Sequence, residues 1–460
     1  MYLIKKFKIP IIIFIIFTSF LLLIIFYNKN YILQKGWQYY PNLMEKIRYV
    51  YFNLPHNLVF IPTSDPIEHD LDIKNKLSLL KFTAAYSKEI NFFNINKKVD
   101  FYMPRKNILL SGISNKYAGS SYLDYFDNNL FLLSARGIIA YGQIDKNEIN
   151  LKQIKNNLNN FLGKDKFIID RSYSFKDLLI FNNKLFVSFT DEIKDDCWGI
   201  SVLQSELSLD YLEFKFLFRE NECIDENNDE GFVSIQTGGR IFGFNNNEIL
   251  LTTGEYRFRK KAQDPASIFG KIIKINLENN KYKIVSMGHR NPQGLYVDEE
   301  NKIVLSTEHG PRGGDEINLL NFDSIKKNII PNFGWPISSY GEHYAKKDKN
   351  IAINKDKQNE IDLLYKKYPL YKSHKQKGFV EPIYTFTPSI GISEIVGLGN
   401  SRYMSSSLGG KKLFFFKLNK ENIDFSYDFH FGERIRDVIY KDNKLIFFME
   451  DTSTIAVVNF

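Results

Sequence analysis

Short apolar runs separated by polar turns dominate the chain after residue 72. Six stretches share one pattern, in which an apolar run leads through an Asn- or Asp-rich turn into a second run rich in Leu, Ile and Phe. They begin at Leu123, Leu178, Arg240, Gly294, Glu394 and Asp437. Because Asn and Asp suit the positive-φ positions of tight turns, each stretch is predicted to form a β-hairpin.

The recurrence of these hairpins predicts the fold class. Repeats of about 40–60 residues that each form a small antiparallel sheet are typical of β-propellers. Six copies predict an all-β, six-bladed β-propeller over residues 73–460, with its inner strands converging on one axis. A β-sandwich with repetitive hairpins is the alternative, but a region this long would need two sandwich domains, and the sequence shows no linker between them.

The N-terminus has a different pattern, because Ile9 to Tyr27 form a run of 19 uncharged residues after a segment with three Lys. A helix of this length approaches the hydrocarbon thickness of a bilayer, about 30 Å. A cleaved signal peptide would have a shorter apolar region that ends in small residues. The pattern predicts an uncleaved membrane anchor, residues 1–30, and a linker, residues 31–72. The preceding lysines predict a single-pass protein whose C-terminal domain is periplasmic or extracytoplasmic.

Net charge is +8, and part of it is concentrated in residues 346–377, which hold ten Lys against four acids. This segment falls in the widest interval between repeats, so it is predicted to be a Lys-rich insertion. It is interpreted as a solvated surface, with contact to anionic lipid or polyanions as the alternative. Aromatic residues and Arg are not interleaved there, so we expect no nucleic-acid partner.

The two cysteines, Cys197 and Cys223, flank two strand-like runs around a turn at Asp210. A hairpin centred on that turn would bring them face to face. Export permits a disulfide, so a bridge between them is predicted, with two unrelated thiols as the alternative.

The stretch EHGPRGGDEIN, residues 308–318, holds more special residues than an ordinary turn needs. It follows the predicted fourth inner strand, which would place it at the cleft where the loops meet. Few side chains surround Gly310 and Pro311, so their carbonyl oxygens could bind a hard cation such as Ca²⁺.

Two further stretches offer positive charge. In GHRNPQGL, residues 288–295, Arg290 and Asn291 precede a proline and provide several hydrogen-bond donors. In GERIRDV, residues 432–438, Arg434 and Arg436 are two apart and would share one face of a strand. Such a pair could hold a multiply anionic ligand or could pair with Glu433, Asp437 or other acids.

Together these stretches resemble the soluble sugar dehydrogenases that depend on pyrroloquinoline quinone (PQQ), also called aldose sugar or glucose/sorbosone dehydrogenases. The resemblance covers roughly residues 110–460. It also includes AQDPASIFGKIIKIN from Ala262, NFGWPISSYGEHY from Asn332 and PIYTFTPSIGIS from Pro382. It implies a six-bladed propeller that binds PQQ at its axis.

The resemblance also implies roles for the site residues. Arg290 and Asn291 would contact the quinone oxygens of PQQ. Arg434 and Arg436 would hold carboxylates of the cofactor.

The carbonyls of Gly310 and Pro311 would bind a Ca²⁺ ion that polarises the quinone. The turn that should carry a further Lys reads SLGGKK, with Gly409 at that position, so Lys411 or Lys412 would have to reach instead.

The sequence departs from the family at the catalytic base. The family carries a histidine four residues before the Arg that opens the third inner strand, and here that position is Gln236. Glutamine does not titrate near neutral pH and cannot act as a general base. His289 and His309 belong to other motifs, and Glu255 is a candidate base by its chemistry.

Two functions are therefore expected. The first is a membrane-anchored, outward-facing oxidoreductase that oxidises aldose sugars with PQQ as hydride acceptor. The second is a non-catalytic binding module that kept the cleft and lost the base. The intact cationic and glycine-rich stretches favour the enzyme, whereas Gln236 and Gly409 favour the binding module. A sugar is the expected partner, and the sequence does not identify the electron acceptor.

Overall fold

The computed structural model describes residues 79–104, 121–135, 137–162, 173–344, 355–420 and 422–460. They belong to one compact unit, Pro62–Phe460. The predicted anchor, residues 1–30, and linker, residues 31–72, lie outside the described residues. Among the helices that the structure describes, none is both long and apolar enough to cross a membrane.

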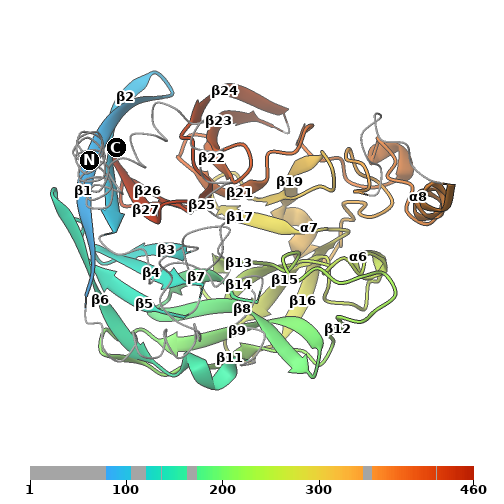
Figure 1. Ribbon diagram of the computed structural model, residues 1–460, viewed down its shortest axis with the longest axis horizontal. Coiled ribbons are helices and arrows are strands. Elements are labelled where there is room, and N and C mark those ends of the chain that lie inside the picture. Colours follow the sequence, from blue (N-terminus) through green and yellow to red (C-terminus); the bar gives the residue numbers. More distant parts are fainter. Residues whose placement is uncertain (1–78, 105–120, 136, 163–172, 345–354, 421) are drawn as a thin grey trace, which may run out of the picture. The chain divides into compact units, whose positions relative to one another are not determined.

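The described residues form mainly antiparallel β-sheets, which confirms the predicted all-β fold (Figure 1). The largest sheet contains β1 (Leu79–Phe92), β2 (Ile95–Pro104), β3 (Ser121–Phe126), β4 (Asn129–Ser134), β5 (Ile139–Gly142), β6 (Glu148–Asn156), β10 (Tyr211–Leu212), β25 (Ile435–Lys441), β26 (Lys444–Met449) and β27 (Thr454–Asn459). The second sheet contains β7 (Phe175–Phe181), β8 (Lys184–Lys194), β9 (Cys197–Glu206), β11 (Lys215–Phe218) and β12 (Ile224–Asp225).

The other three sheets have four strands each within the described residues. They contain β13 (Gly238–Asn245), β14 (Glu248–Thr253), β15 (Lys271–Asn276) and β16 (Tyr282–Met287); β17 (Pro292–Asp298), β18 (Ile303–Glu308), β19 (Asp315–Asn321) and β20 (Tyr384–Phe386); and β21 (Ile392–Gly397), β22 (Arg402–Ser407), β23 (Lys412–Asn419) and β24 (Asn422–His430). Short helices lie in the connections: η3 (Leu158–Phe161), α6 (Lys260–Gln263), α7 (Phe322–Lys326), α8 (Lys355–Lys367) and η4 (Lys375–Lys377).

The first strands of the predicted hairpins pack against one another in a closed cycle. In order, the cycle runs β3, β7, β13, β17, β21, β25 and back to β3. Figure 1 shows these strands toward the centre around which the sheets are arranged, with strands such as β16 and β24 farther out. Loops at one end of the cycle therefore come together although they are far apart in the sequence.

The predicted hairpins are confirmed, and their turns explain why Asn and Asp recur. β3–β4, β7–β8 and β25–β26 are joined by two-residue turns in which both residues have positive φ. These turns are Asp127–Asn128, Asn182–Asn183 and Asp442–Asn443. Short polar side chains tolerate this left-handed conformation, which matches the twist of the strands.

Buried acids connect neighbouring first strands. Each accepts a hydrogen bond from a backbone N–H of a strand that neighbours its own in the cycle. The pairs are Asp437 with Leu123, Asp124 with Ile180, Asp177 with Ile241, and Glu394 with Leu295. A single cation, Arg240, lies among three of these acids, with Nη1 2.6 Å from Asp437, 3.0 Å from Asp177 and 2.9 Å from Glu394.

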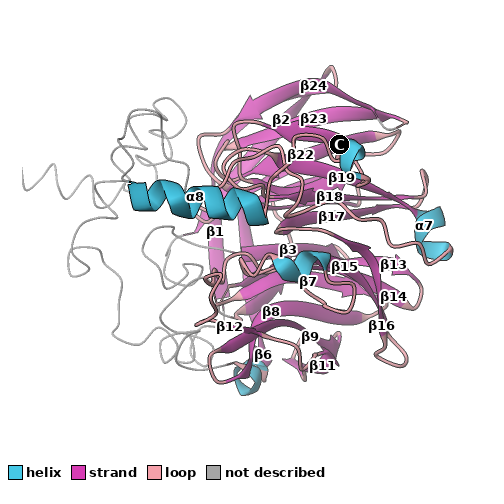
Figure 2. Cartoon of the chain, turned by 90° about the vertical axis from the view of Figure 1, so that its right-hand side faces the viewer, coloured by secondary structure: helices cyan, strands magenta, loops and turns pink. Residues whose placement is uncertain are grey.

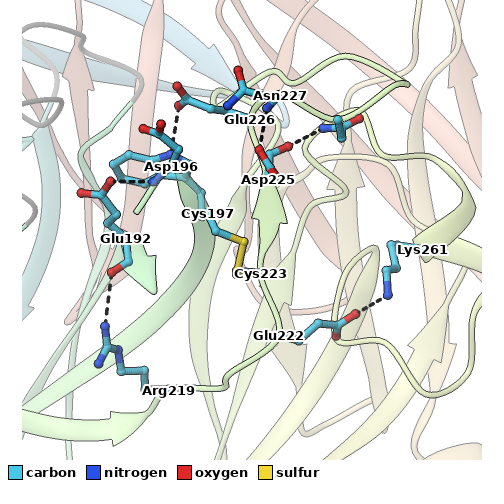
Figure 3. The surroundings of a disulfide bond; sticks show 12 residues. Glu192, Asp196, Cys197, Arg219, Glu222, Cys223, Asp225, Glu226, Asn227 and Lys261 are labelled. Carbon is cyan, nitrogen blue, oxygen red and sulfur yellow. Dashed lines mark hydrogen bonds and ion pairs between the residues drawn. A yellow bond between two sulfur atoms is a disulfide. The ribbon is translucent and has the colours of Figure 1, made fainter. Parts of the chain in front are cut away.

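The predicted disulfide is confirmed, with an S–S distance of 2.04 Å between Cys197 and Cys223 (Figure 3). It joins β9 to the segment before β12, and these two strands pair antiparallel. The neighbouring Glu222 accepts hydrogen bonds from Lys261 Nζ and from the backbone N–H of Ile268, both at 2.8 Å. The bridge therefore supports the connection between β14 and β15.

One predicted loop position is wrong. Residues 308–318 do not follow the fourth first strand, β17, but connect β18 to β19. The apolar run before them is the second strand of its hairpin, a distinction that the hydrophobic pattern does not make. Because Pro292 at the start of β17 is paired with Glu308, the segment still lies at the end where β17 begins.

The predicted insertion, residues 346–377, includes α8 and η4, and its residues 346–354 lie outside the described residues. Figure 2 shows α8 and α7 on opposite sides of the sheets. The residue after α8, Tyr368, donates a hydrogen bond to Glu230 at 2.7 Å, which attaches this part of the insertion to the segment before β13.

Candidate active site

One cavity of about 190 Å³ collects side chains from several connections of the fold. It lies beside the start of β13, the turn after β14, the start of β17 and the turn after β18. Its walls are formed by Val233, Ile235, Gln236, Glu255, Arg257, Arg259, Arg290, Pro311, Trp335, His343 and Tyr344. The structure thus brings together four residues that the sequence singled out: Gln236, Glu255, Arg290 and Pro311.

Glu255 has the environment of a general base. Its side chain is fully buried, and its backbone N–H donates to the carbonyl of Arg290 at 3.1 Å. Burial raises the pKa of Glu255 to about 7, although Arg290 and Arg259 act in the opposite direction. Gln236 lies at the position where the resemblance places a histidine, two residues before β13. The carboxyl group of Glu255, which titrates near neutral pH, can accept a proton in this cavity, whereas the Gln236 amide cannot.

Arg290 is held in place on several sides. Its backbone N–H donates to Glu308 Oε2 at 2.8 Å, and its Nη1 donates to the carbonyl of His309 at 2.9 Å. The guanidinium carbon is 5.4 Å from the ring centre of Trp335, within the range of a cation–π interaction. The arginine therefore presents a fixed positive charge to the cavity.

Asn291 is largely committed to the protein. Its Oδ1 accepts hydrogen bonds from the backbone N–H of Gly238 at 3.1 Å and from Nε2 of Gln293 at 3.0 Å. The amide nitrogen is therefore the group of Asn291 that could face a ligand.

The turn at Gly310 and Pro311 is closely packed. A Cβ atom on Gly310 would lie 2.1 Å from the carbonyl oxygen of Gly314, so only glycine fits there. The Gly310 N–H donates to Asp315 Oδ1 at 3.0 Å, and Ser389 Oγ donates to the Pro311 carbonyl at 3.3 Å. Within the described part of the chain, no three His, Cys, Asp or Glu side chains are grouped to hold a metal ion.

Comparison with known proteins decides the family. The glucose/sorbosone dehydrogenase family model matches residues 179–458, which is more than half of the chain. The chain belongs to the glucose/sorbosone dehydrogenase family. The match includes every stretch that carries the chemistry of the cavity.

Named relatives agree with this family. Aldose sugar dehydrogenase YliI of Escherichia coli is 26% identical over 180 residues, which are 36% of this chain and 45% of that protein. The chain spans about half the length of the first curated relatives it matches.

Two solved structures share the fold. The soluble aldose sugar dehydrogenase of E. coli, in its apo form, is 19% identical, with a TM-score of 0.59 over 78% of this chain and 99% of its own. The PQQ-bound aldose sugar dehydrogenase of Streptomyces coelicolor is 17% identical, with a TM-score of 0.53 over 74% of this chain and 94% of its own. At such identities the likeness shows the fold alone, that of β-propeller sugar dehydrogenases.

The arginine pair expected at the axis of the glucose/sorbosone dehydrogenase fold is bound to an acid of this chain. Arg434 Nε lies 2.7 Å from Glu450 Oε2, and Arg436 Nη2 lies 2.9 Å from Glu450 Oε1. Although burial alone would raise it, the two arginines lower the pKa of Glu450 to about 2. Arg434 precedes β25, and a register shift occurs at Arg436, so the two residues are not at regular alternate positions of a strand.

Arg436 is still connected to the cavity region. Arg436 and Arg290 both lower the pKa of His309, although burial is the larger cause. Lys411 does not line the cavity, and its charge lies near Glu433. Lys412 is also outside the lining and forms an ion pair with Asp428 at 3.0 Å. The cofactor roles expected for Arg434, Arg436 and Lys411 therefore stay predictions.

Seven lining residues were not among the predicted site residues: Val233, Ile235, Arg257, Arg259, Trp335, His343 and Tyr344. The last three lie in NFGWPISSYGEHY, which carried part of the family resemblance, so that stretch was a usable signal. Burial lowers the pKa of His343 to about 4, so this ring is neutral at pH 7. The two arginines follow Glu255 closely in the sequence, but nothing in the local pattern marks them as cavity residues.

Proposed function

We propose that this protein is an oxidoreductase that oxidises aldose sugars with PQQ as the hydride acceptor. The observation that carries the proposal is the single cavity that Gln236, Glu255, Arg290 and Pro311 line together. Membership in the glucose/sorbosone dehydrogenase family supports it, as does the PQQ-bound form of a protein with the same fold.

The residues present fit a planar polyanion such as PQQ. Arg290 supplies a fixed guanidinium at the cavity, and Asn291 can donate from its amide nitrogen. The Nε of Arg436 is buried without a hydrogen-bond partner among the residues that the structure describes, as expected of a group that awaits an acceptor.

A Ca²⁺ ion, if present, would be bound by the carbonyls of Gly310 and Pro311 together with oxygens of the cofactor. Lys411 would approach a cofactor carboxylate only after its side chain turns away from Glu433. When bound, PQQ supplies a two-electron acceptor for the hydride of the sugar.

Glu255 would act as the base in place of the family histidine. Its carboxylate would take the proton of the C1 hydroxyl as the C1 hydride leaves, which gives a lactone from the aldose. Arg290 and Arg259 keep part of the Glu255 population ionised at pH 7 against the effect of burial. Trp335 and Tyr344 offer aromatic surfaces against which a sugar ring could pack.

The finer architecture and the location are also proposals. The ten-stranded sheet is interpreted as two blades, β3–β6 and β25–β27 with β2, which β1 joins to each other, so the propeller has six blades. The uncharged run from Ile9 to Tyr27 supports a membrane anchor with the propeller outside the cytoplasm.

A binding and turnover experiment tests this function. The whole chain, purified in detergent, is mixed with PQQ and Ca²⁺ under argon, and an aldose is then added. Loss of the oxidised quinone absorbance on addition of the sugar supports the enzyme. Failure of PQQ to bind at all would refute the proposed function.

One observation favours a second candidate, a binding module without turnover. Gln236 lacks a titratable group at the position of the family base. Binding of PQQ without reduction by sugar would favour this module. Turnover that appears only in the Gln236→His variant would show that the base had been lost at that position.

A further inference from the structure

Arginine dominates the charge of the cavity wall. Arg257, Arg259 and Arg290 line the cavity, and Glu255 is the only acid among the lining residues. Glu255 is partly protonated near pH 7, and His343 is neutral there. The wall therefore carries an excess of about two positive charges, more than an uncharged sugar requires.

Glu230, the other acid whose charge acts on Arg259, makes its hydrogen bonds elsewhere. Glu230 Oε1 accepts hydrogen bonds from Lys367 Nζ at 2.8 Å and from the Tyr368 hydroxyl at 2.7 Å. Its Oε2 accepts the backbone N–H of Arg259 at 3.1 Å, not the guanidinium. The guanidinium of Arg259 contacts the carbonyl of Arg257 at 3.5 Å and lies 5.7 Å from the ring centre of Tyr368. Neither contact supplies a negative charge, so the guanidinium can still bind an anionic ligand.

Arg257 and Arg259 also have unmet hydrogen-bonding capacity. The residue Arg259 is only 7% exposed, and its Nε is buried with no hydrogen-bond partner in the described part of the chain. The Nε of Arg257 is buried in the same state. An unmet buried donor is costly, and one edge of a guanidinium, Nε with one Nη, matches the two oxygens of a carboxylate.

The backbone takes an unfavourable conformation to place these arginines. Tyr256 and Arg257 both have positive φ, 51° and 74°, in a turn without glycine. Bulky residues rarely adopt this conformation, and such strain is concentrated at functional sites. The turn carries the chain directly from Glu255 to the two arginines.

We propose that the substrate is an acidic aldose, a hexuronic acid whose C6 carboxylate binds Arg259 and Arg257. This inference rests on the proposed function, because it assigns the substrate of the same cavity. In a hexuronic acid, C1 and C5, which carries the carboxylate, are both bonded to the ring oxygen. The group that binds the carboxylate and the base that acts at C1 must therefore be close together. Arg259 and Glu255 meet this requirement, because they interact electrostatically. The carboxylate takes no part in the oxidation, in which the hydride of C1 would pass to PQQ and the proton of the C1 hydroxyl to Glu255.

Ligand binding measured by calorimetry tests the proposal without turnover. The whole chain is titrated with D-glucuronate, with its neutral amide and with D-glucose, both with and without PQQ. We expect glucuronate to bind about 10- to 100-fold more tightly than the two neutral sugars, the range of a hydrogen bond to a charged group. Equal affinity for all three would overturn the proposal. Glucose 6-phosphate serves as a further arm, and tighter binding of this phosphate would refute the carboxylate assignment.

Variants of Arg259 test whether this arginine binds the carboxylate of the substrate or a carboxylate of the cofactor. Arg259→Gln should abolish the preference for glucuronate over its amide, and Arg259→Lys should restore part of it. The matched control Arg402→Gln removes an arginine of β22 and should leave the preference intact. Loss of PQQ affinity in Arg259→Gln, in proportion to the loss for glucuronate, would assign the arginine to the cofactor instead. If PQQ fails to bind the parent chain, the proposed function fails, whereas the glucuronate preference is still measured directly.

Discussion

The pKa of the cavity residue Glu255 is set by burial and by several charged neighbours. Burial favours the neutral acid, and Arg290 and Arg259 favour the ionised form, so that the pKa settles at about 7. A base is most effective when its pKa lies near the working pH. The adjacent Gln236 can orient a sugar hydroxyl by hydrogen bonding but cannot accept its proton.

The variant Glu255→Gln tests the role of this base. Replacing the carboxylate by an amide of the same size should lower kcat/KM by about 10²- to 10⁴-fold. In the parent protein, kcat/KM should rise as the pH increases through about 7, because only the deprotonated carboxylate accepts a proton. The measurement is the pH dependence of kcat/KM, and the variant should lack this inflection.

The buried acid Glu394 provides a matched control. Its pKa is also raised by burial, to about 8, but it does not line the cavity. Glu394→Gln should therefore keep the inflection near pH 7. An unchanged inflection in Glu255→Gln would show that another group titrates.

How much of the site the sequence reveals depends on the kind of residue. Arg290, Pro311 and Gln236 lie in recognisable motifs, and their positions at one cavity follow from the fold. Arg259 does not, because its importance depends on whether an acid neutralises it. That acid, Glu230, is occupied by Lys367 and Tyr368, more than 130 residues away in the sequence. A local sequence pattern cannot predict that these distant residues bind Glu230 in place of the Arg259 guanidinium.

Among the elements, the β25–β26 hairpin shows how a remote acid changes the meaning of a motif. Arg434 precedes the hairpin and Glu450 follows it, so the two ends meet, with the Glu450 N–H donating to the Arg434 carbonyl at 2.7 Å. The hairpins themselves were predictable from alternating apolar runs and Asn turns. The position of β1 between β2 and β6 was not, because it pairs segments that no local signal connects.

The variant Glu450→Gln tests the stability that this ion pair contributes. The folded pKa of Glu450, about 2, lies below the ordinary value of about 4.3, so the ionised form stabilises the folded state. This shift corresponds to about 3 kcal/mol above pH 5, which is lost progressively as the pH falls toward 2. In urea unfolding, the difference between parent and variant should be about 3 kcal/mol at pH 6 and clearly smaller at pH 3. A difference that does not depend on pH would contradict the ionic origin.

In the whole molecule, the cycle of first strands is joined by buried charge as well as by apolar packing. Arg240 of β13 contacts acids of β7, β21 and β25, and its Nη2 donates to the carbonyl of Arg436 at 3.0 Å. One cation cannot compensate three ionised carboxylates. Burial raises the pKa of Asp177 to about 7 and that of Glu394 to about 8, and the neighbouring acids act in the same direction, whereas Arg240 lowers both pKa values. The sequence predicted the cycle from its repeats, but not that one arginine would connect four of its strands.

The variant Arg240→Met should therefore destabilise the whole cycle. Removing one partner of a buried ionic network costs about 3–5 kcal/mol, because the remaining charges lose their compensation. The folded pKa values of Asp177 and Glu394 lie above the unfolded values, so stability falls as the pH rises from about 4 to about 8. Without Arg240 these values rise further, so the variant should lose more stability at pH 9 than at pH 5. Urea unfolding at both pH values measures this, with Arg402→Met, which removes a partly exposed arginine, as the control. An equal loss in Arg240→Met at the two pH values would mean that packing, and not charge compensation, holds the first strands together at this point.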